Sequence, residues 1–177
     1  MNRKASDMTA NDELLPCKII TAYKGVQVIV DADDYEYLSQ YKWHIKIGGG
    51  GNLYACRSAG GKTIRMHREI MKATAGQEID HINHNSLDNR KCNLRICTRS
   101  QNGMNKRPIK GNYKGVSFCN TRKKWFSQIC SNNDRKTIGY YSSEVDAARA
   151  YDEYAQKLHG EFAFLNFPDT PFTQQKE

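Results

Sequence analysis

The sequence contains no long hydrophobic run. None of its apolar segments approaches the roughly 18 residues that a membrane-spanning helix needs, and residues 1–15 are polar and mixed in charge, unlike a signal peptide. We therefore expect a soluble, cytoplasmic protein that begins with a disordered lead over residues 1–15. With 177 residues and 38% hydrophobic content, the chain favours two or three small modules over one large core.

The sequence also lacks paired cysteines. Its six cysteines form no C-x-x-C pair, whereas a structural zinc site usually has two such pairs or a Cys/His equivalent. We expect reduced, mostly buried thiols and no structural zinc. A zinc site of Cys92, Cys97, His81 and His84 is the alternative, but the spacing of the two cysteines across a strand is poor ligand geometry.

Acidic residues are scarce in one part of this basic chain. The net charge of the whole chain is +8. Residues 106–136 hold nine Lys or Arg and one Asp, so this window alone carries a charge of +8. Such a concentration of positive charge favours a polyanionic partner.

The segment DHINHNSLDNRKCNLRICTRSQN, from Asp80 to Asn102, has the most specific pattern. Asp80 and His81 end a short strand-like run, polar turn formers follow, and NLRICT, starting at Asn93, predicts a returning strand. The next residues predict a short helix with Ser100 as its cap and Asn102 in its first turn. The predicted unit is strand, loop, strand, helix.

The neighbours Asp80 and His81 suit phosphodiester chemistry. On a strand their side chains point to opposite faces, so the carboxylate can face a metal and the imidazole a water. Hydrolysis near neutral pH needs a base with a pKa close to the working pH, and a cation to offset charge on the phosphate and the departing 3′ oxygen. A carboxylate and an amide oxygen are hard ligands, which Mg²⁺ prefers.

This pattern resembles the His-Asn-His (HNH) nuclease family, whose ββα-metal fold carries D-H on the first strand, N on the second, and H or N on the helix. The resemblance covers residues 66–106. It implies Asp80 and Asn102 as metal ligands, His81 as general base, and Asn93 as the residue that orients the His81 ring through a hydrogen bond. Because the last position is Asn rather than His, the sequence is more similar to the homing-endonuclease branch than to the bacterial toxin branch.

Two other histidines leave alternatives open. His84 lies in the predicted turn, where we favour a surface or loop-stabilising role over a catalytic one. His67 opens a predicted short helix, HREIMKAT. For His67 we favour packing against the strand–loop–strand unit over a direct phosphate contact.

Residues 17–66 alternate short β-rich runs with turns. This pattern predicts four or five strands of an antiparallel sheet. The run DYEYLSQY predicts a short helix between them, capped by Asp33 or Asp34. We assign the aromatic side chains of this region to the core in preference to a nucleic-acid stacking platform; they are Tyr35, Tyr37, Tyr41, Trp43 and Tyr54.

Residues 103–112, GMNKRPIKGN, predict a basic linker. It either follows the phosphates of a bound groove or is a solvated tether, and the sequence does not separate these alternatives. Residues 113–168 then predict three strands and one helix that begins at Ser142 or Ser143 and ends at Gly160. The apolar stripe of this helix is Val145, Ala148, Tyr151, Ala155 and Leu158.

The motifs Y-K-G-V, K-W, I-G-Y-Y, A-A-R-A-Y-D and L-N-F-P occur in order over residues 113–168. They resemble the Apetala-type, ethylene-response-factor (ERF) DNA-binding domain, in which a three-stranded sheet enters the major groove. Where the plant family has Arg, this chain has Ser117 and Cys119, so base preference does not carry over. The basic linker and the resemblance together imply DNA contacts from Lys106, Arg107, Lys110, Lys114, Arg122, Lys123, Lys124, Gln128, Arg135 and Lys136.

The sequence therefore predicts an α+β protein. It has an N-terminal antiparallel β-rich region, a central ββα-metal motif, and a C-terminal three-stranded antiparallel sheet packed on one helix. The predicted parts are a lead at 1–15, the β-rich region plus nuclease at 16–102, a linker at 103–112, a DNA-binding domain at 113–168 and a tail at 169–177.

The predicted function is a site-directed, homing-type DNA endonuclease, similar to phage or intron-borne enzymes. It is expected to use Mg²⁺, with Mn²⁺ as a substitute, and to act on double-stranded DNA as a monomer. A DNA-binding regulator without cleavage activity is the first alternative, but it leaves Asp80, His81, Asn93 and Asn102 unexplained. An RNA-processing nuclease is the second, and the ERF-like module argues for duplex DNA instead.

Overall fold

The computed structural model describes residues 16–108, 111–131 and 134–168. The predicted lead at 1–15, the tail at 169–177 and Lys110 lie outside these residues. The fold is α+β, as predicted, and the chain divides into two compact units, Met1–Ile96 and Cys97–Glu177. None of the helices in the described part of the chain combines the length and apolar character that crossing a bilayer requires.

Two separate antiparallel sheets form the first part of unit 1. β1 (Cys17–Thr21) pairs with β2 (Gln27–Asp31), and the other sheet has the order β3-β4-β5. The five strands are thus divided between two sheets and not joined in one as predicted, because a helix leads the chain away from β2 before β3 begins. The remaining elements here are α1 (Ala32–Ser39), β3 (His44–Ile47), β4 (Leu53–Ala59), β5 (Lys62–Arg65) and α2 (Met66–Ile70).

One core joins these elements. Of the aromatic residues predicted to be buried, Trp43 is 3% exposed, and Tyr35 and Tyr41 pack against the core, whereas Tyr37 is 49% exposed. The indole N–H of Trp43 donates to the carbonyl of Leu38 at 2.8 Å, so its polar atom is satisfied inside the core. The core residues are Ile20, Ala22, Val28, Val30, Leu38, Trp43, Ala55 and Met66.

Two short strands complete unit 1. β6 (Glu78–His81) and β7 (Leu94–Cys97) form a two-stranded sheet joined by a long loop, as predicted. The loop contains three polar side chains that are almost fully buried, those of Asp88, Asn89 and Asn93. The side chains of Asp88 and Asn93 have hydrogen-bonded partners inside this loop, so the loop is a structured element.

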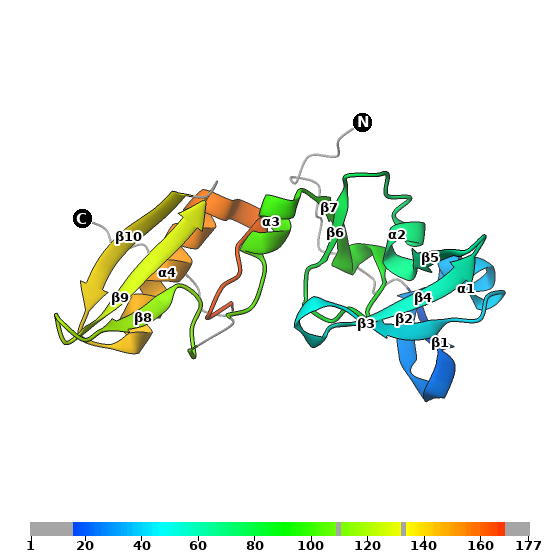
Figure 1. The fold of residues 1–177 in the computed structure, drawn as a ribbon, viewed down its shortest axis with the longest axis horizontal. Helices are drawn as coiled ribbons and strands as arrows, with labels where there is room; N and C mark the ends of the chain where they lie inside the picture. The colour runs from blue at the N-terminus through cyan, green and yellow to red at the C-terminus, as the bar shows by residue number, and fades with distance from the viewer. Residues whose placement is uncertain (1–15, 109–110, 132–133, 169–177) are drawn as a thin grey trace. The chain divides into compact units, whose positions relative to one another are not determined.

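Unit 2 is a three-stranded antiparallel sheet with a long helix across one face (Figure 1). β9 (Lys124–Ser131) lies between β8 (Val116–Cys119) and β10 (Asp134–Tyr141). α4 (Glu144–His159) begins at Ser143, whose hydroxyl caps it, and ends at Gly160. A short helix, α3 (Arg99–Met104), precedes the sheet and extends into the predicted linker.

The buried stripe of α4 differs from the predicted one at both ends. Ala148, Tyr151 and Ala155 are buried as predicted, but Val145 is 39% and Leu158 48% exposed. His159 is buried in place of Leu158. It follows Ala148 by eleven residues, which is about three helical turns, so the two side chains lie on the same face of the helix. The other side chains of α4 that are buried are Ala147 and Asp152.

Two helix starts also differ from the prediction. The N-cap of α1 is Asp31, and the predicted caps Asp33 and Asp34 lie in the first turn, where their charge suits the helix dipole. The N-cap of α3 is Thr98 and not Ser100. Its hydroxyl and a glutamine three residues later form a capping box, which satisfies two backbone N–H groups at once.

The cysteines are all free thiols, but, contrary to the prediction, most of them are not buried. Cys56 and Cys97 are buried, whereas Cys17, Cys92 and Cys130 are exposed. Cys130 illustrates the reason, since it lies on the face of β9 that points away from α4, opposite to the buried Ile129.

Candidate active site

Asp80 and His81 occupy the last two positions of β6, and both are buried. Asp80 is 6% and His81 7% exposed. Arg95, on β7, donates two hydrogen bonds to Oδ2 of Asp80, from Nε at 2.9 Å and from Nη2 at 2.6 Å. The carboxylate is therefore held by a cation on the adjacent strand, a partner that the sequence analysis did not identify.

The imidazole of His81 lies in a cluster of three rings. His67, on α2, packs edge-on against it with ring centroids 5.2 Å apart. Tyr54, on β4, lies 5.3 Å from His67 and 6.2 Å from His81. The prediction that His67 packs against this unit is confirmed. Tyr54, which the sequence analysis assigns to the core, lies against the two histidines instead.

Burial controls the protonation of both imidazoles. It lowers the pKa of His81 below its ordinary value, and the Asn89 amide and two nearby carboxylates only partly offset this. Burial and the neighbouring positive charges lower the pKa of His67 to about 3. Both rings are therefore neutral near pH 7, and the neutral imidazole is the form that accepts a proton.

Asn93, 5% exposed, closes the loop that follows His81. Its Oδ1 accepts from the backbone N–H of Asn83 at 2.9 Å, and its Nδ2 donates to the carbonyl of Asp88 at 2.8 Å. Its own carbonyl accepts from the N–H of Ile82 at 2.9 Å. Asn93 therefore holds the chain directly after His81, while its influence on the ring orientation stays a prediction.

Asp88 is a second anchor inside the loop. It is 2% exposed, forms a salt bridge with Arg90 at 2.7 Å, and accepts from Nδ2 of Asn83 at 2.9 Å. Burial raises its pKa, but the hydrogen bonds from Arg90 and Asn83 bring that pKa below its ordinary value. A charged carboxylate therefore braces the loop from within.

The loop rests on the edge of β2. The N–H of Ile29 donates to the carbonyl of Leu87 at 2.9 Å, and the N–H of Asn89 donates to the carbonyl of Ile29 at 2.8 Å. The N–H of Lys91 donates to Oδ2 of Asp31 at 2.8 Å. The N-terminal β-rich region is therefore the scaffold of the loop that follows His81, a function that its own sequence does not indicate.

His84 lies in the turn directly after β6, as predicted. Its φ of 62° is in the left-handed region, and its N–H donates to the carbonyl of His81 at 3.0 Å. This backbone contact fits a loop-stabilising role, and its side chain is half-buried.

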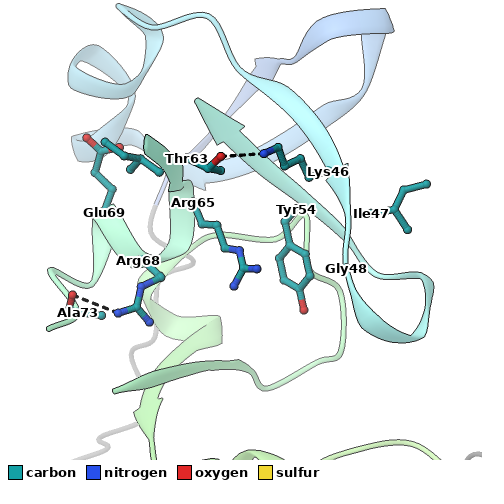
Figure 2. A pocket seen from close by; sticks show the side chains of 10 residues that line it. Lys46, Ile47, Gly48, Tyr54, Thr63, Arg65, Arg68, Glu69 and Ala73 are labelled. Carbon is teal, nitrogen blue, oxygen red and sulfur yellow. Dashed lines mark hydrogen bonds between the residues drawn. The ribbon is translucent and has the colours of Figure 1, made fainter. Parts of the chain in front are cut away.

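An open pocket of about 690 Å³ lies beside Tyr54. Figure 2 shows the side chains of Lys46, Arg65 and Arg68 around it. The Arg65 guanidinium lies 5.5 Å from the centre of the Tyr54 ring, a cation–π contact that holds the ring from the side of the pocket. Tyr54, which also packs against His81, thus lines this pocket. The pocket also holds one carboxylate, that of Glu69, which forms a salt bridge with Arg57.

Asn102 lies on α3 in unit 2, partly buried, with its N–H donating to the carbonyl of Thr98 at 2.9 Å. Its partnership with Asp80 stays a prediction. In the described part of the chain, no three His, Cys, Asp or Glu side chains gather as a metal-binding group. One carboxylate and one amide would be a small set of hard oxygen ligands, which leaves most coordination positions to water and phosphate, as Mg²⁺ prefers.

Three predicted DNA contacts lie on the face of the unit 2 sheet that points away from α4. They are Lys124, Gln128 and Arg135, placed there by the alternation of β9 and by its register with β10. Lys124 and Arg135 are exposed, and Gln128 is half-buried. The guanidinium of Arg122 lies 4.5 Å from the ring centre of Tyr140. We call this surface the outer face.

Two other predicted contacts lie elsewhere. Nζ of Lys136 donates to the hydroxyl of Tyr154 at 2.8 Å, so this side chain is turned toward α4. Nζ of Lys114 donates to the carbonyl of Met104 and lies 5.4 Å from the ring centre of Phe164. The remaining candidates among the described residues are exposed: Lys106, Arg107 and Lys123.

Comparison with known proteins finds two families, matched by successive stretches of the chain. The HNH endonuclease model matches residues 72–104, which include all four predicted active-site residues. A relative from Acanthamoeba polyphaga mimivirus, described as an uncharacterized HNH endonuclease, is 32% identical over 149 residues, which cover 81% of this chain and 76% of the relative. The chain belongs to the HNH endonuclease family. No solved structure matches it.

This HNH family member carries a second family signature. The AP2 domain model matches residues 111–161, which contain the sheet of unit 2 and α4. Both resemblances noted in the sequence are thus confirmed. Tyr54 and His67 precede the HNH match, and no local sequence signal pairs their rings with His81. Arg95, the partner of Asp80, lies inside the match, two residues after Asn93.

Proposed function

We propose that this HNH nuclease is a site-directed, homing-type endonuclease that hydrolyses double-stranded DNA with one divalent metal ion and His81 as general base. The observation that supports this most is that Asp80, held by Arg95, and the buried imidazole of His81 are adjacent on β6, inside the stretch that matches the HNH endonuclease model. A neutral imidazole beside a carboxylate provides a base and a metal ligand on one strand.

Asp80 and Asn102 would hold the metal ion, Mg²⁺ or in its place Mn²⁺. Both offer oxygen, and Asp80 is already fixed by the two hydrogen bonds from Arg95. When bound, the ion offsets the negative charge that develops on the phosphate and the departing 3′ oxygen.

The protein's own residues carry the proton transfer. A ring nitrogen of His81 takes the proton of the attacking water as its oxygen bonds to phosphorus and the bond to the 3′ oxygen breaks. His67 and Tyr54 pack against the His81 ring and limit its motion. Asn93 fixes the backbone that follows.

The AP2-like module supplies the targeting. Its outer face presents Lys124, Gln128 and Arg135, with Arg122 beside them, and we propose that this face meets the duplex. The proposed nuclease part is residues 16–102, the linker 103–112 and the targeting domain 113–168. One active site per chain suits a monomer that makes one cut.

Incubation of the purified protein with a pool of duplex DNA, with and without Mg²⁺, followed by mapping of the new ends, tests this function. The parent protein should produce ends at preferred sites only with Mg²⁺. His81→Ala should produce none, yet bind duplex within about a factor of three, because the base is needed only for chemistry. Equal cutting by variant and parent contradicts the assignment.

The match to the AP2 domain supports one other function, a DNA-binding regulator that does not cleave. The same experiment separates the two. Binding to duplex without new ends, in Mg²⁺ and in Mn²⁺, would favour the regulator.

A further inference from the structure

A second pocket, of about 630 Å³, lies within unit 2. β8 pairs with β9 only as far as Ser127, and the next residue, Gln128, donates its N–H to the carbonyl of Gly115 at 2.8 Å. Beyond this point, no strand of the described residues pairs with this edge of β9. The pocket is formed there by residues of α3, β9, β10 and the C-terminal part of α4.

Among the residues that the structure describes, the strongly charged side chains that line this pocket are all basic. Arg99, Lys114 and Arg135 line it, and no carboxylate is among its lining residues. Arg99 and Arg135 are exposed and form no salt bridge within the described part of the chain. Two guanidinium groups that share one pocket repel each other, so the site is stabilised when an anion enters.

His159 also lines the pocket and is 7% exposed. Within the described residues, neither of its ring nitrogens makes a hydrogen bond of good geometry. Burial and the charge of Lys114 lower its pKa, and the nearby Cys130 carbonyl offsets this only in part. The ring is therefore neutral near pH 7, and its place in the pocket lining makes its environment sensitive to an anion bound there.

We propose that this pocket binds a backbone phosphate of duplex DNA, held by Arg99 and Arg135 beside the buried ring of His159. The choice of DNA as the ligand rests on the proposed function. Phosphate oxygens accept several hydrogen bonds and match guanidinium groups in shape and charge. Gln128 and Arg135 belong to both the pocket and the outer face, so the pocket borders the surface proposed to meet the duplex.

A phosphate in this pocket would also fix α3 against the DNA. Arg99 opens α3, and Asn102, the proposed second metal ligand, lies three residues later on the same helix. The pocket therefore links the targeting module to the nuclease site: a duplex seated on the outer face would hold the helix that carries Asn102.

Arg99→Gln is the variant that tests the pocket, with Lys157→Gln as its matched control. Both positions are exposed, and Lys157 lies on α4 close to His159 but outside the pocket lining. Affinity for a mixed-sequence duplex, measured in EDTA over a range of salt, should fall about eightfold at 0.1 M salt for Arg99→Gln, with a salt slope smaller by about 0.9. Lys157→Gln should leave both values close to those of the parent.

The ring signal of His159, assigned by comparison with His159→Gln, gives an independent measurement by NMR. It should shift when the duplex is added to the parent protein and shift much less in Arg99→Gln. Equal losses for Arg99→Gln and Lys157→Gln, or an unmoved His159 signal at saturating duplex, would overturn the proposal. Cleavage in Mg²⁺ is measured separately. If Arg99→Gln weakens binding and the His159 signal shifts, but no DNA is cut, then the phosphate site is supported and the proposed function is wrong.

Discussion

Arg95 holds Asp80 through two hydrogen bonds to a single carboxylate oxygen, and both side chains are largely buried, 12% and 7% exposed. The two formal charges cancel, so this pair offers a metal ion an oriented oxygen ligand but little net attraction. A hard cation that dehydrates reluctantly would bind such a site weakly until a DNA phosphate completes its coordination.

We predict that Asp80→Asn abolishes cleavage as EDTA does. The substitution removes the carboxylate but leaves the Arg95 charge, so the site becomes positive and repels a divalent cation. Duplex binding by unit 2 should persist in the variant and in EDTA. Cleavage assays over a series of Mg²⁺ and Mn²⁺ concentrations measure this effect. Asn102→His should keep some activity in the same assays, because it offers a ligand type that is common in metal sites. Undiminished cutting by Asp80→Asn would show that the metal site lies elsewhere.

Asn93→Ala should destabilise unit 1 by about 2–4 kcal/mol, because it leaves the N–H of Asn83 and the carbonyl of Asp88 without their partners in a buried loop. Asn85→Ala is the control, since Asn85 is exposed and its side-chain oxygen accepts a local bond from the N–H of Leu87. Urea denaturation compares the two. Similar losses of stability would argue against Asn93 as the residue that closes the loop.

The stability of unit 1 should fall with acid because of His67. Its pKa is lowered from 6.5 to about 3 in the folded state, so between these values the unfolded chain binds the extra proton and stability drops as pH falls. In His67→Phe the slope over this range should be smaller by up to about 1.4 kcal/mol per pH unit. Urea denaturation of both proteins is measured from pH 7 to pH 4 by Trp43 fluorescence. Both proteins carry Trp125→Phe, so that the fluorescence reports on unit 1 alone. Parallel pH profiles of the two proteins would refute the assignment.

Lys124 and Lys136 provide a matched test of the outer face. Lys124→Ala should weaken duplex binding and reduce the salt slope by about 0.9, as expected for one lost phosphate contact. Lys136→Ala should have a smaller effect, because its ammonium is bound by the hydroxyl of Tyr154 on the side of α4. DNA titrations at several salt concentrations compare the two variants. A larger loss of affinity for Lys136→Ala than for Lys124→Ala would place the DNA on the other side of the sheet.

Several features follow from local sequence alone. The alternation of β9 predicts which side chains face α4, because a strand has a period of two regardless of what surrounds it. The adjacent Asp80 and His81, followed by Asn93 and Asn102 at fixed spacing, identify the family for a similar reason: the motif that matches the family is one continuous stretch of chain.

Other features needed the tertiary structure. Arg95 meets Asp80, and His67 and Tyr54 meet His81, only after strands and helices distant in sequence have packed together. Whether Lys136 is open to a ligand depends on Tyr154, eighteen residues away on another element. The sequence by itself determined the family and most of the types of elements, because short-range spacing encodes them. Only the fold decided which side chains are buried, neutral or already paired, because burial and long-range contacts set those properties.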